Sequence, residues 1–134
     1  MNKNIITNTD SYKIGMHLSY PTKTEYVYSY VESRGGNENE VVMFGLQYFI
    51  KEYLMKPITQ NDLDRAKKII EAHGDVLNVE GWQYIIDKHN GYLPVSIKAL
   101  PEGTVVGNRV VMAVVVNTDP ECYWLTTWLE TALL

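Results

Sequence analysis

Apolar residues along this chain recur with two periods, which predict both helices and strands. Apolar positions three and four residues apart, with polar positions between them, predict amphipathic helices. These helices are expected over residues 11–19, 42–54, 60–73 and 78–90. Alternating or short continuous apolar runs predict strands. The strands are expected over residues 25–32, 93–100, 105–106 and 110–116, and a last helix follows residues 117–120. The pattern as a whole predicts an α+β fold.

Turn and cap residues set the ends of several elements. Residues 59–62 resemble a capping box that closes with an aspartate, and Gly74 suits a helix end. Pro57 ends the helix before that box. Asp119 followed by Pro120 is a strong helix start, because the aspartate caps a backbone amide and proline fits the first helical turn.

Two of the strands carry patterns that predict which of their faces are buried. Alternation over residues 25–32 places Tyr26, Tyr28 and Tyr30 on one face and the valines on the other. The run over residues 110–116 is almost wholly apolar, so we expect it to be buried on both faces.

The last helix is apolar around most of its circumference and should be buried nearly all round. Its apolar residues are Tyr123, Trp124, Leu125, Trp128, Leu129, Ala132, Leu133 and Leu134. It reaches Leu134 with no cap, no basic last turn and no polar tail. We therefore expect residues 1–134 to be a single domain or a fragment of a longer protein. Docking of this helix into its own core, or into a symmetry partner, is the alternative.

Composition and charge narrow the class of protein. The 134 residues suffice for one domain, and 46% apolar with 21% charged residues fits a globular chain. The net charge of −4 argues against non-specific nucleic-acid binding. No apolar run reaches the length of a membrane span, and the first residues lack a signal-peptide core. Cys122 stands alone, which fits a reducing compartment. Together these features predict a cytoplasmic protein without nucleic-acid or membrane partners.

Motifs that carry catalysis or bind metals are not found in the sequence. It holds no glycine-rich phosphate loop, and His17, His73 and His89 are scattered without metal-ligand spacing. No catalytic residue and no metal ligand are therefore assigned within this chain. The ten tyrosines and three tryptophans exceed the two phenylalanines, and most of them are expected to be half-buried core residues.

A cluster of polar and aromatic residues near the start is the best candidate for a binding site. Asp10, Tyr12 and Lys13 stand where a helix should begin, and a flat ring beside a fixed acid can hold a small planar ligand. Arg34, beside a glycine pair, could contact an anion. Each residue also has a purely structural interpretation: Asp10 as a helix cap, Tyr12 as a half-exposed aromatic and Arg34 as a surface charge. Only the clustering favours a site.

At these residues the sequence resembles the nicotinamide phosphoribosyltransferase family. The similarity runs through the whole chain and in order, and the long block over residues 117–126 makes chance improbable. The matching residues are 9–13, 20–21 with 24, 27–30 with 32 and 34, 44–48, 81–82 with 84–85, 91 with 93–94, 97–99, 101–103 and 117–126. The nicotinate phosphoribosyltransferases share the general fold but resemble these segments less.

The resemblance implies an activity, a partner and site residues. Members join nicotinamide to phosphoribosyl pyrophosphate, with Mg²⁺, to give nicotinamide mononucleotide and pyrophosphate in NAD salvage. They are homodimers with active sites at the subunit interface. The resemblance makes this chain a single N-terminal domain or fragment of such a protein, and most of each site comes from a later α/β barrel that is absent from this sequence. The residue matching Tyr12 stacks on nicotinamide in the other subunit's site. The residue matching Asp10 orients the carboxamide, and the residue matching Arg34 reaches toward the phosphates.

The sequence departs from the family in one segment, and two alternative functions remain to be considered. The segment after Arg34, residues 35–40, is short where vertebrate-type members carry a longer charged insertion. This suggests a bacterial or phage-type member and leaves the role of Arg34 less certain. The chain alone is expected to be inactive. The alternatives are a non-catalytic binding or dimerisation module and a nicotinate-using phosphoribosyltransferase.

Overall fold

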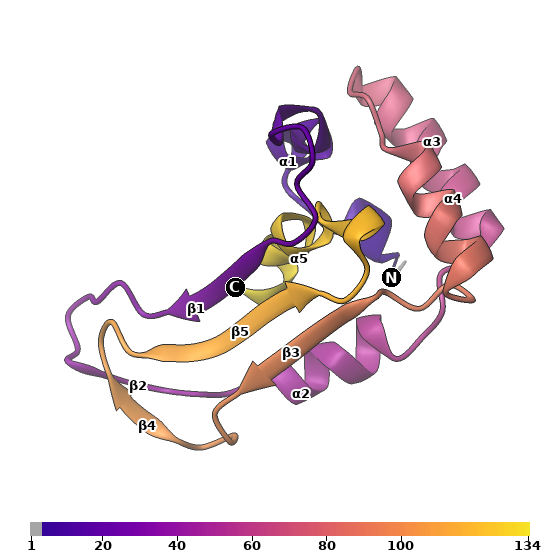
Figure 1. Ribbon diagram of the computed structural model, residues 1–134. Helices are drawn as coiled ribbons and strands as arrows, with labels where there is room; N and C mark the ends of the chain where they lie inside the picture. The colour runs from indigo at the N-terminus through magenta and orange to yellow at the C-terminus, as the bar shows by residue number, and fades with distance from the viewer. Residues whose placement is uncertain (1–3) are drawn as a thin grey trace.

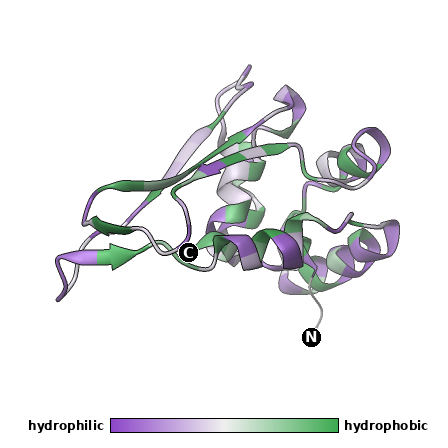
Figure 2. Ribbon diagram, turned by 90° about the horizontal axis from the view of Figure 1, so that it is seen from below, coloured by the Kyte–Doolittle hydropathy of each residue, from purple (hydrophilic) through white to green (hydrophobic). Residues whose placement is uncertain are grey.

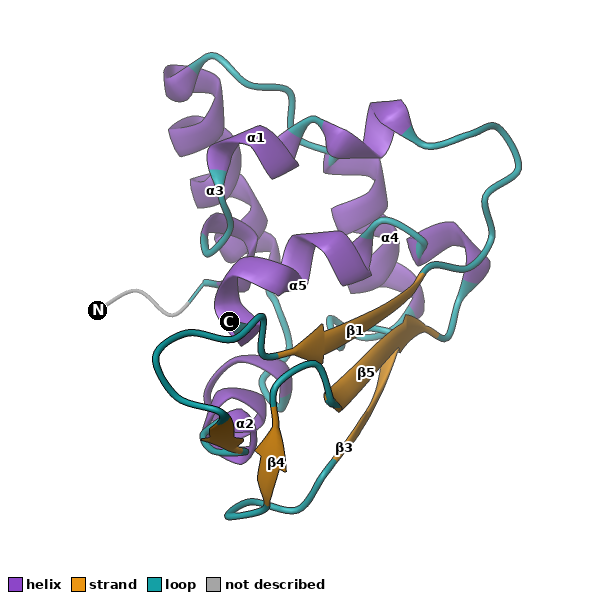
Figure 3. Cartoon of the chain, turned by 90° about the vertical axis from the view of Figure 1, so that its left-hand side faces the viewer, coloured by secondary structure: helices purple, strands orange, loops and turns teal. Residues whose placement is uncertain are grey.

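The computed structural model describes residues 4–134, in which a three-stranded antiparallel sheet is covered on one side by helices (Figures 1 and 3). The helices are α1 (Ser11–Ile14), α2 (Leu46–Phe49), α3 (Gln60–His73), α4 (Val79–Lys88) and α5 (Leu125–Leu133). The strands are β1 (Tyr28–Glu32), β2 (Glu40–Val42), β3 (Val95–Ala99), β4 (Val105–Gly107) and β5 (Val111–Asn117). Short 3₁₀ turns occupy Ile5–Thr7, Met16–Ser19 and Pro120–Cys122, and a π-helical turn occupies Ile50–Leu54. The α+β prediction is confirmed.

The main sheet has the order β1-β5-β3, so the longest strand lies in the centre. Its register pairs Tyr28 with Val116 and Tyr30 with Val114. Both tyrosines are exposed, as is Tyr26, so the predicted tyrosine face is confirmed. A second, two-stranded sheet pairs β2 with β4. Among the described residues, no helix is long and apolar enough to cross a membrane.

Strand β5 is buried on one face only, so the prediction of burial on both faces was wrong. Ala113 and Val115 face the core beneath α5 and are almost fully buried. Val111 is exposed, and Val114 and Val116 are partly exposed on the tyrosine face. The apolar run is therefore not a reliable sign of double burial here, because within residues 4–134 the helices cover one side of the sheet.

Three tryptophans form the centre of the core. The ring of Trp82 in α4 lies edge-on to Trp124 and Trp128, with centroids 4.8 and 5.3 Å away. The Trp128 indole N–H donates to the Ile5 carbonyl at 3.2 Å, which ties the N-terminal segment to α5. Figure 2 shows that the helices alternate between hydrophobic and hydrophilic residues, whereas long stretches of the sheet are hydrophobic. The helices thus turn their apolar faces toward this core.

The helix expected over residues 42–54 begins later than predicted. Val42 belongs to β2, and Gly45 has a φ of 97°, which an α-helix cannot include. Helix α2 starts at Leu46 because the Glu102 carboxylate accepts from the backbone amides of Gly45 at 2.8 Å and Gln47 at 2.9 Å. A side chain more than fifty residues away therefore caps this helix, and no local pattern contains that information.

The other boundaries follow the sequence signals to different degrees. The predicted helix over residues 60–73 is confirmed, with Thr59 and Asp62 forming the capping box. The predicted helix over residues 78–90 is confirmed but two residues shorter at its C-terminal end. The helix expected over residues 11–19 is divided, because α1 ends before Gly15 and a 3₁₀ turn follows. Strand β1 begins at Tyr28 rather than at residue 25.

The last helix is less completely buried than its apolar circumference predicted. Residues 120–122 form a 3₁₀ turn capped by Asp119, and α5 starts at Leu125. Leu125 and Leu129 are fully buried, whereas Leu134 is 77% exposed. Burial is therefore complete in the first turns of α5 and is lost toward its end, which contradicts the expectation of burial nearly all round.

Candidate functional site

The loop that leads into α1 is held against the C-terminal half of α5. The Thr9 hydroxyl donates to the Trp128 carbonyl at 3.0 Å, and the Asp10 amide donates to the Thr131 hydroxyl at 3.1 Å. Because these bonds join residues about 120 positions apart, the start of α1 has a fixed place on the last helix.

Asp10 takes the cap position of α1 but does not cap it with its side chain. Its backbone is extended, and its carboxylate makes no hydrogen bond to the amides of the helix. The carboxylate instead accepts from the Thr131 hydroxyl at 2.7 Å through Oδ2. This hydrogen bond is the main cause that lowers the pKa of Asp10; partial burial opposes it, and Lys13 lowers the pKa further. The interpretation of Asp10 as a side-chain helix cap was wrong, and the group is ionised at neutral pH.

Lys13 is almost completely buried beneath this carboxylate. Its Nζ lies 2.9 Å from Glu130 Oε2 and 3.4 Å from Asp10 Oδ2, and it donates to the Thr131 hydroxyl at 3.0 Å. Burial alone would lower the pKa of Lys13, but the hydrogen bond and the charge of Glu130 outweigh it, so the pKa is raised. The ammonium is therefore charged and paired.

Tyr12 stands between these two anchored residues, yet its ring is 67% exposed. The Nζ of Lys13 lies 5.5 Å from the centre of the ring. An aromatic ring that is fixed at its base and open on its face can stack on a flat ligand. Asp10 and Tyr12 thus stand two positions apart at the start of α1, and their role as a binding site stays a prediction.

Arg34 lies in the loop after β1 and lines an open hollow of about 360 Å³ beside α5. Glu130 of α5 lines the same hollow as Arg34 and also forms the ion pair with Lys13. Within residues 4–134 no hydrogen bond or ion pair joins Arg34 to Asp10 or Tyr12. The structure thus places Arg34 near the same helix without joining it to the cluster, and its role stays a prediction.

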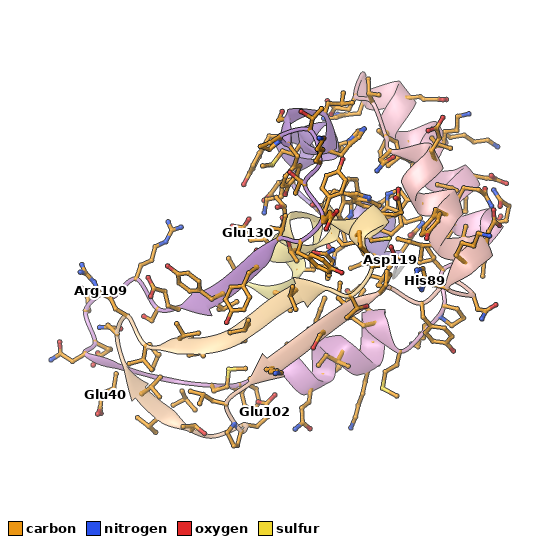
Figure 4. The ribbon with its side chains drawn as sticks, in the orientation of Figure 1. Glu40, His89, Glu102, Arg109, Asp119 and Glu130 are labelled. Atoms are coloured by element: carbon orange, nitrogen blue, oxygen red, sulfur yellow. The ribbon has the colours of Figure 1, made fainter. Side chains whose placement is uncertain are left out.

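Glu130 and Thr131 contact the residues of this cluster, and neither was predicted from the sequence. Glu130 is the only charged residue of α5, whose polar residues also include Thr126, Thr127 and Thr131, and Figure 4 shows Glu130 on this helix close to the first strand. A charged residue on a largely apolar helix was the available signal. The residues that Glu130 and Thr131 contact, Lys13 and Asp10, could not be identified from the sequence, because they lie near the other end of the chain.

A second polar cluster lies at the C-terminal end of β5 (Figure 4). Asp119 Oδ2 is 2.7 Å from His89 Nε2 and accepts from the Tyr84 hydroxyl at 3.1 Å, while Oδ1 accepts from the Glu121 amide at 2.9 Å. Burial alone would raise the pKa of Asp119, but the bonds from Glu121, His89 and Tyr84 lower it overall. This cluster joins α4 to the start of the last helix.

Acid should weaken the fold through Asp119. A carboxyl whose pKa is lower in the folded chain stabilises that state above its unfolded value, near 3.8, and this contribution disappears as pH falls through the folded value. Below pH 3.8 the unfolding free energy of the wild type should fall as pH falls. We expect Asp119→Asn to reduce the slope of this fall, by at most about 1.4 kcal/mol per pH unit. Urea titrations between pH 2 and 6 measure this slope, with Asp64→Asn on exposed α3 as the control. An unchanged slope in Asp119→Asn would contradict the expectation.

Thiol chemistry and metal binding receive no support from the described residues. Cys122 is fully buried, and burial raises the pKa of its thiol to about 12, so the thiol is neutral and inaccessible. Residues 4–134 contain no group of three or more histidine, cysteine or acidic side chains that could hold a metal ion.

The fold matches that of a solved phosphoribosyltransferase. The crystal structure of human nicotinic acid phosphoribosyltransferase superimposes with a TM-score of 0.52 at 19% identity, over 94% of this chain and 24% of that one. This likeness shows that the two chains share a fold. The family model described as "Nicotinamide phosphoribosyltransferase, N-terminal domain" matches residues 4–97. The chain belongs to this family, as the sequence resemblance indicated.

Two bacterial relatives support the family assignment and show what share of a full-length member this chain covers. The nicotinamide phosphoribosyltransferase of Xanthomonas campestris is 44% identical over 131 residues, which are 98% of this chain and 28% of the relative. That of Acinetobacter baylyi is 34% identical over 148 residues, or 97% of this chain and 29% of the relative. The chain therefore spans under a third of the length of these relatives.

Proposed function

We propose that this chain is the N-terminal part of a homodimeric nicotinamide phosphoribosyltransferase and supplies one wall of the partner subunit's nicotinamide pocket. The observation that carries the proposal is the Tyr12 ring, which is fixed at its base by two anchored neighbours and still two-thirds exposed. Membership of the family supports the reaction, in which nicotinamide and phosphoribosyl pyrophosphate give nicotinamide mononucleotide and pyrophosphate. The lone, buried Cys122 supports action in the cytoplasm.

Asp10 favours nicotinamide over nicotinate on electrostatic grounds. Its hydrogen bonds and ion pair use Oδ2, and no described residue bonds to Oδ1. An ionised carboxylate with a free oxygen attracts the N–H donors of a carboxamide and repels the carboxylate of nicotinate. Tyr12 would stack on the pyridine ring, and Arg34 would face the phosphates.

The reaction is a substitution at the anomeric carbon of the ribose. The pyridine nitrogen forms the new bond to that carbon as the bond to pyrophosphate breaks, through an oxocarbenium-like transition state. This domain contributes the orientation of nicotinamide, which raises the effective concentration of the attacking nitrogen. Mg²⁺ accompanies the phosphoribosyl pyrophosphate, and no residue described here is assigned to hold it.

The proposal is tested on the complete enzyme, meaning these residues joined to a phosphoribosyltransferase body. The body comes from the same gene or, in a chimera, from the Xanthomonas relative. We expect kcat/KM to be higher for nicotinamide than for nicotinate and Asp10→Asn to narrow the difference. A preference for nicotinate would support the nicotinate-using alternative. Nicotinamide binding without turnover of either substrate would support a non-catalytic module.

A further inference from the structure

Lys13 places a buried charge directly beneath the proposed nicotinamide wall. Its side chain is 2% exposed, whereas the Tyr12 ring that precedes it is 67% exposed. A buried ammonium is unfavourable unless other groups pair with it. The family assignment and the proposed roles of Asp10 and Tyr12 give this charge no task.

The ammonium joins the loop before α1 to two consecutive residues of α5. It lies 2.9 Å from the Glu130 carboxylate and 3.4 Å from that of Asp10, and it donates to the Thr131 hydroxyl at 3.0 Å. Thr131 donates in turn to Asp10 Oδ2 at 2.7 Å and accepts from the Asp10 amide at 3.1 Å. These contacts form one closed network that connects the two ends of the chain.

The network is needed because α1 cannot fix Tyr12 by itself. The helix has four residues, too few to be stable without tertiary contacts. Tyr12 follows Asp10 by two positions and precedes Lys13, so anchoring both neighbours fixes the backbone that carries the ring. The ammonium also lies 5.5 Å from the ring centre, within the range of a cation–π contact.

We propose that Lys13 is a positioning residue for nicotinamide: its buried ammonium, held by Glu130 and Thr131, fixes Asp10 and the Tyr12 ring in the orientation that stacks on the substrate. The proposal rests on the proposed function of this wall. It predicts that α5, which supplies neither the ring nor the Asp10 carboxylate, nonetheless affects the affinity for nicotinamide.

The test compares Michaelis constants for both substrates in the complete enzyme. Lys13→Met keeps the apolar stem and removes the charge; it should raise KM for nicotinamide about fivefold, which corresponds to about 1 kcal/mol, and leave KM for phosphoribosyl pyrophosphate unchanged. Lys13→Arg should restore part of the loss. Thr131→Val removes the bridging hydroxyl but leaves the buried ammonium paired with Glu130, and should act in the same direction to a smaller extent. Lys67→Met, in an exposed ion pair on α3, is the matched control.

A double variant separates positioning from general stability. If Lys13 acts through the ring, Lys13→Met should add little to KM for nicotinamide once Tyr12→Ala is present. Additive effects, or equal increases in both Michaelis constants, would overturn the proposal. Should Lys13→Met fail to fold, Thr131→Val decides: an unchanged KM there overturns the proposal while Tyr12→Ala still tests the wall. An unchanged KM in Tyr12→Ala would overturn the wall and the positioning role together.

Discussion

Replacement of Tyr12 by alanine is expected to raise KM for nicotinamide in the complete enzyme by about 5-fold to 150-fold, because stacking on an aromatic side chain contributes about 1–3 kcal/mol. KM for phosphoribosyl pyrophosphate should change little, since the proposed stacking involves only the planar substrate. Steady-state kinetics with each substrate varied in turn measure both constants.

The controls for Tyr12 distinguish stacking from a general loss of surface. Tyr12→Phe keeps the ring and should retain most of the affinity. Tyr92→Ala removes a ring that is also exposed but lies after α4, outside the cluster, and should leave both constants unchanged. An unchanged KM for nicotinamide in Tyr12→Ala, with Tyr12→Phe behaving like wild type, would exclude the stacking role.

Replacement of Trp82 by alanine should be the most damaging change to the fold. Its side chain is fully buried against two further tryptophans, and truncation of such a residue costs about 3–5 kcal/mol of unfolding free energy. That is a large part of the stability of an ordinary domain. Urea unfolding of the 134-residue chain, followed by circular dichroism, measures the difference from wild type.

Trp82→Phe is the matched control for this core position. The Trp82 indole N–H has no hydrogen-bond partner in the described part of the chain, so phenylalanine removes volume without breaking a bond and should cost clearly less than alanine. Trp128→Phe, by contrast, also loses the bond to the Ile5 carbonyl. A cost below about 1 kcal/mol for Trp82→Ala would show that the three tryptophans are not the centre of the core.

Local sequence signals predicted the parts of the fold whose determinants lie close together in the chain. The capping box at Thr59 and the turn after Gly74 set the limits of α3, and alternation identified the face of Tyr28 and Tyr30. Helix α2 was misplaced because its cap, Glu102, lies far away in the sequence. The prediction that β5 is buried on both faces was wrong for a similar reason. The apolar run of the strand does not show which of its faces a helix from another part of the chain covers.

The candidate site likewise combines residues that are close together in the sequence with residues that are far apart in it. Asp10, Tyr12 and Lys13 are neighbours in sequence, and their clustering was sufficient to select them. Glu130 and Thr131, which hold them in place, come from the last helix and were found only in the structure. The identity of the proposed ligand, nicotinamide, comes from the family resemblance and could not have been inferred from the residue types alone.

The central claim is that Asp10 and Tyr12 form a wall of the nicotinamide pocket of the partner subunit. A crystal structure of the complete enzyme with nicotinamide bound tests it most directly. We expect the Tyr12 ring to lie about 4.5–7 Å, centre to centre, from the pyridine ring held by the other subunit. Asp10 Oδ1 should lie about 3 Å from the carboxamide nitrogen. Nicotinamide bound without contact to Tyr12 and Asp10 of the other subunit would contradict the claim.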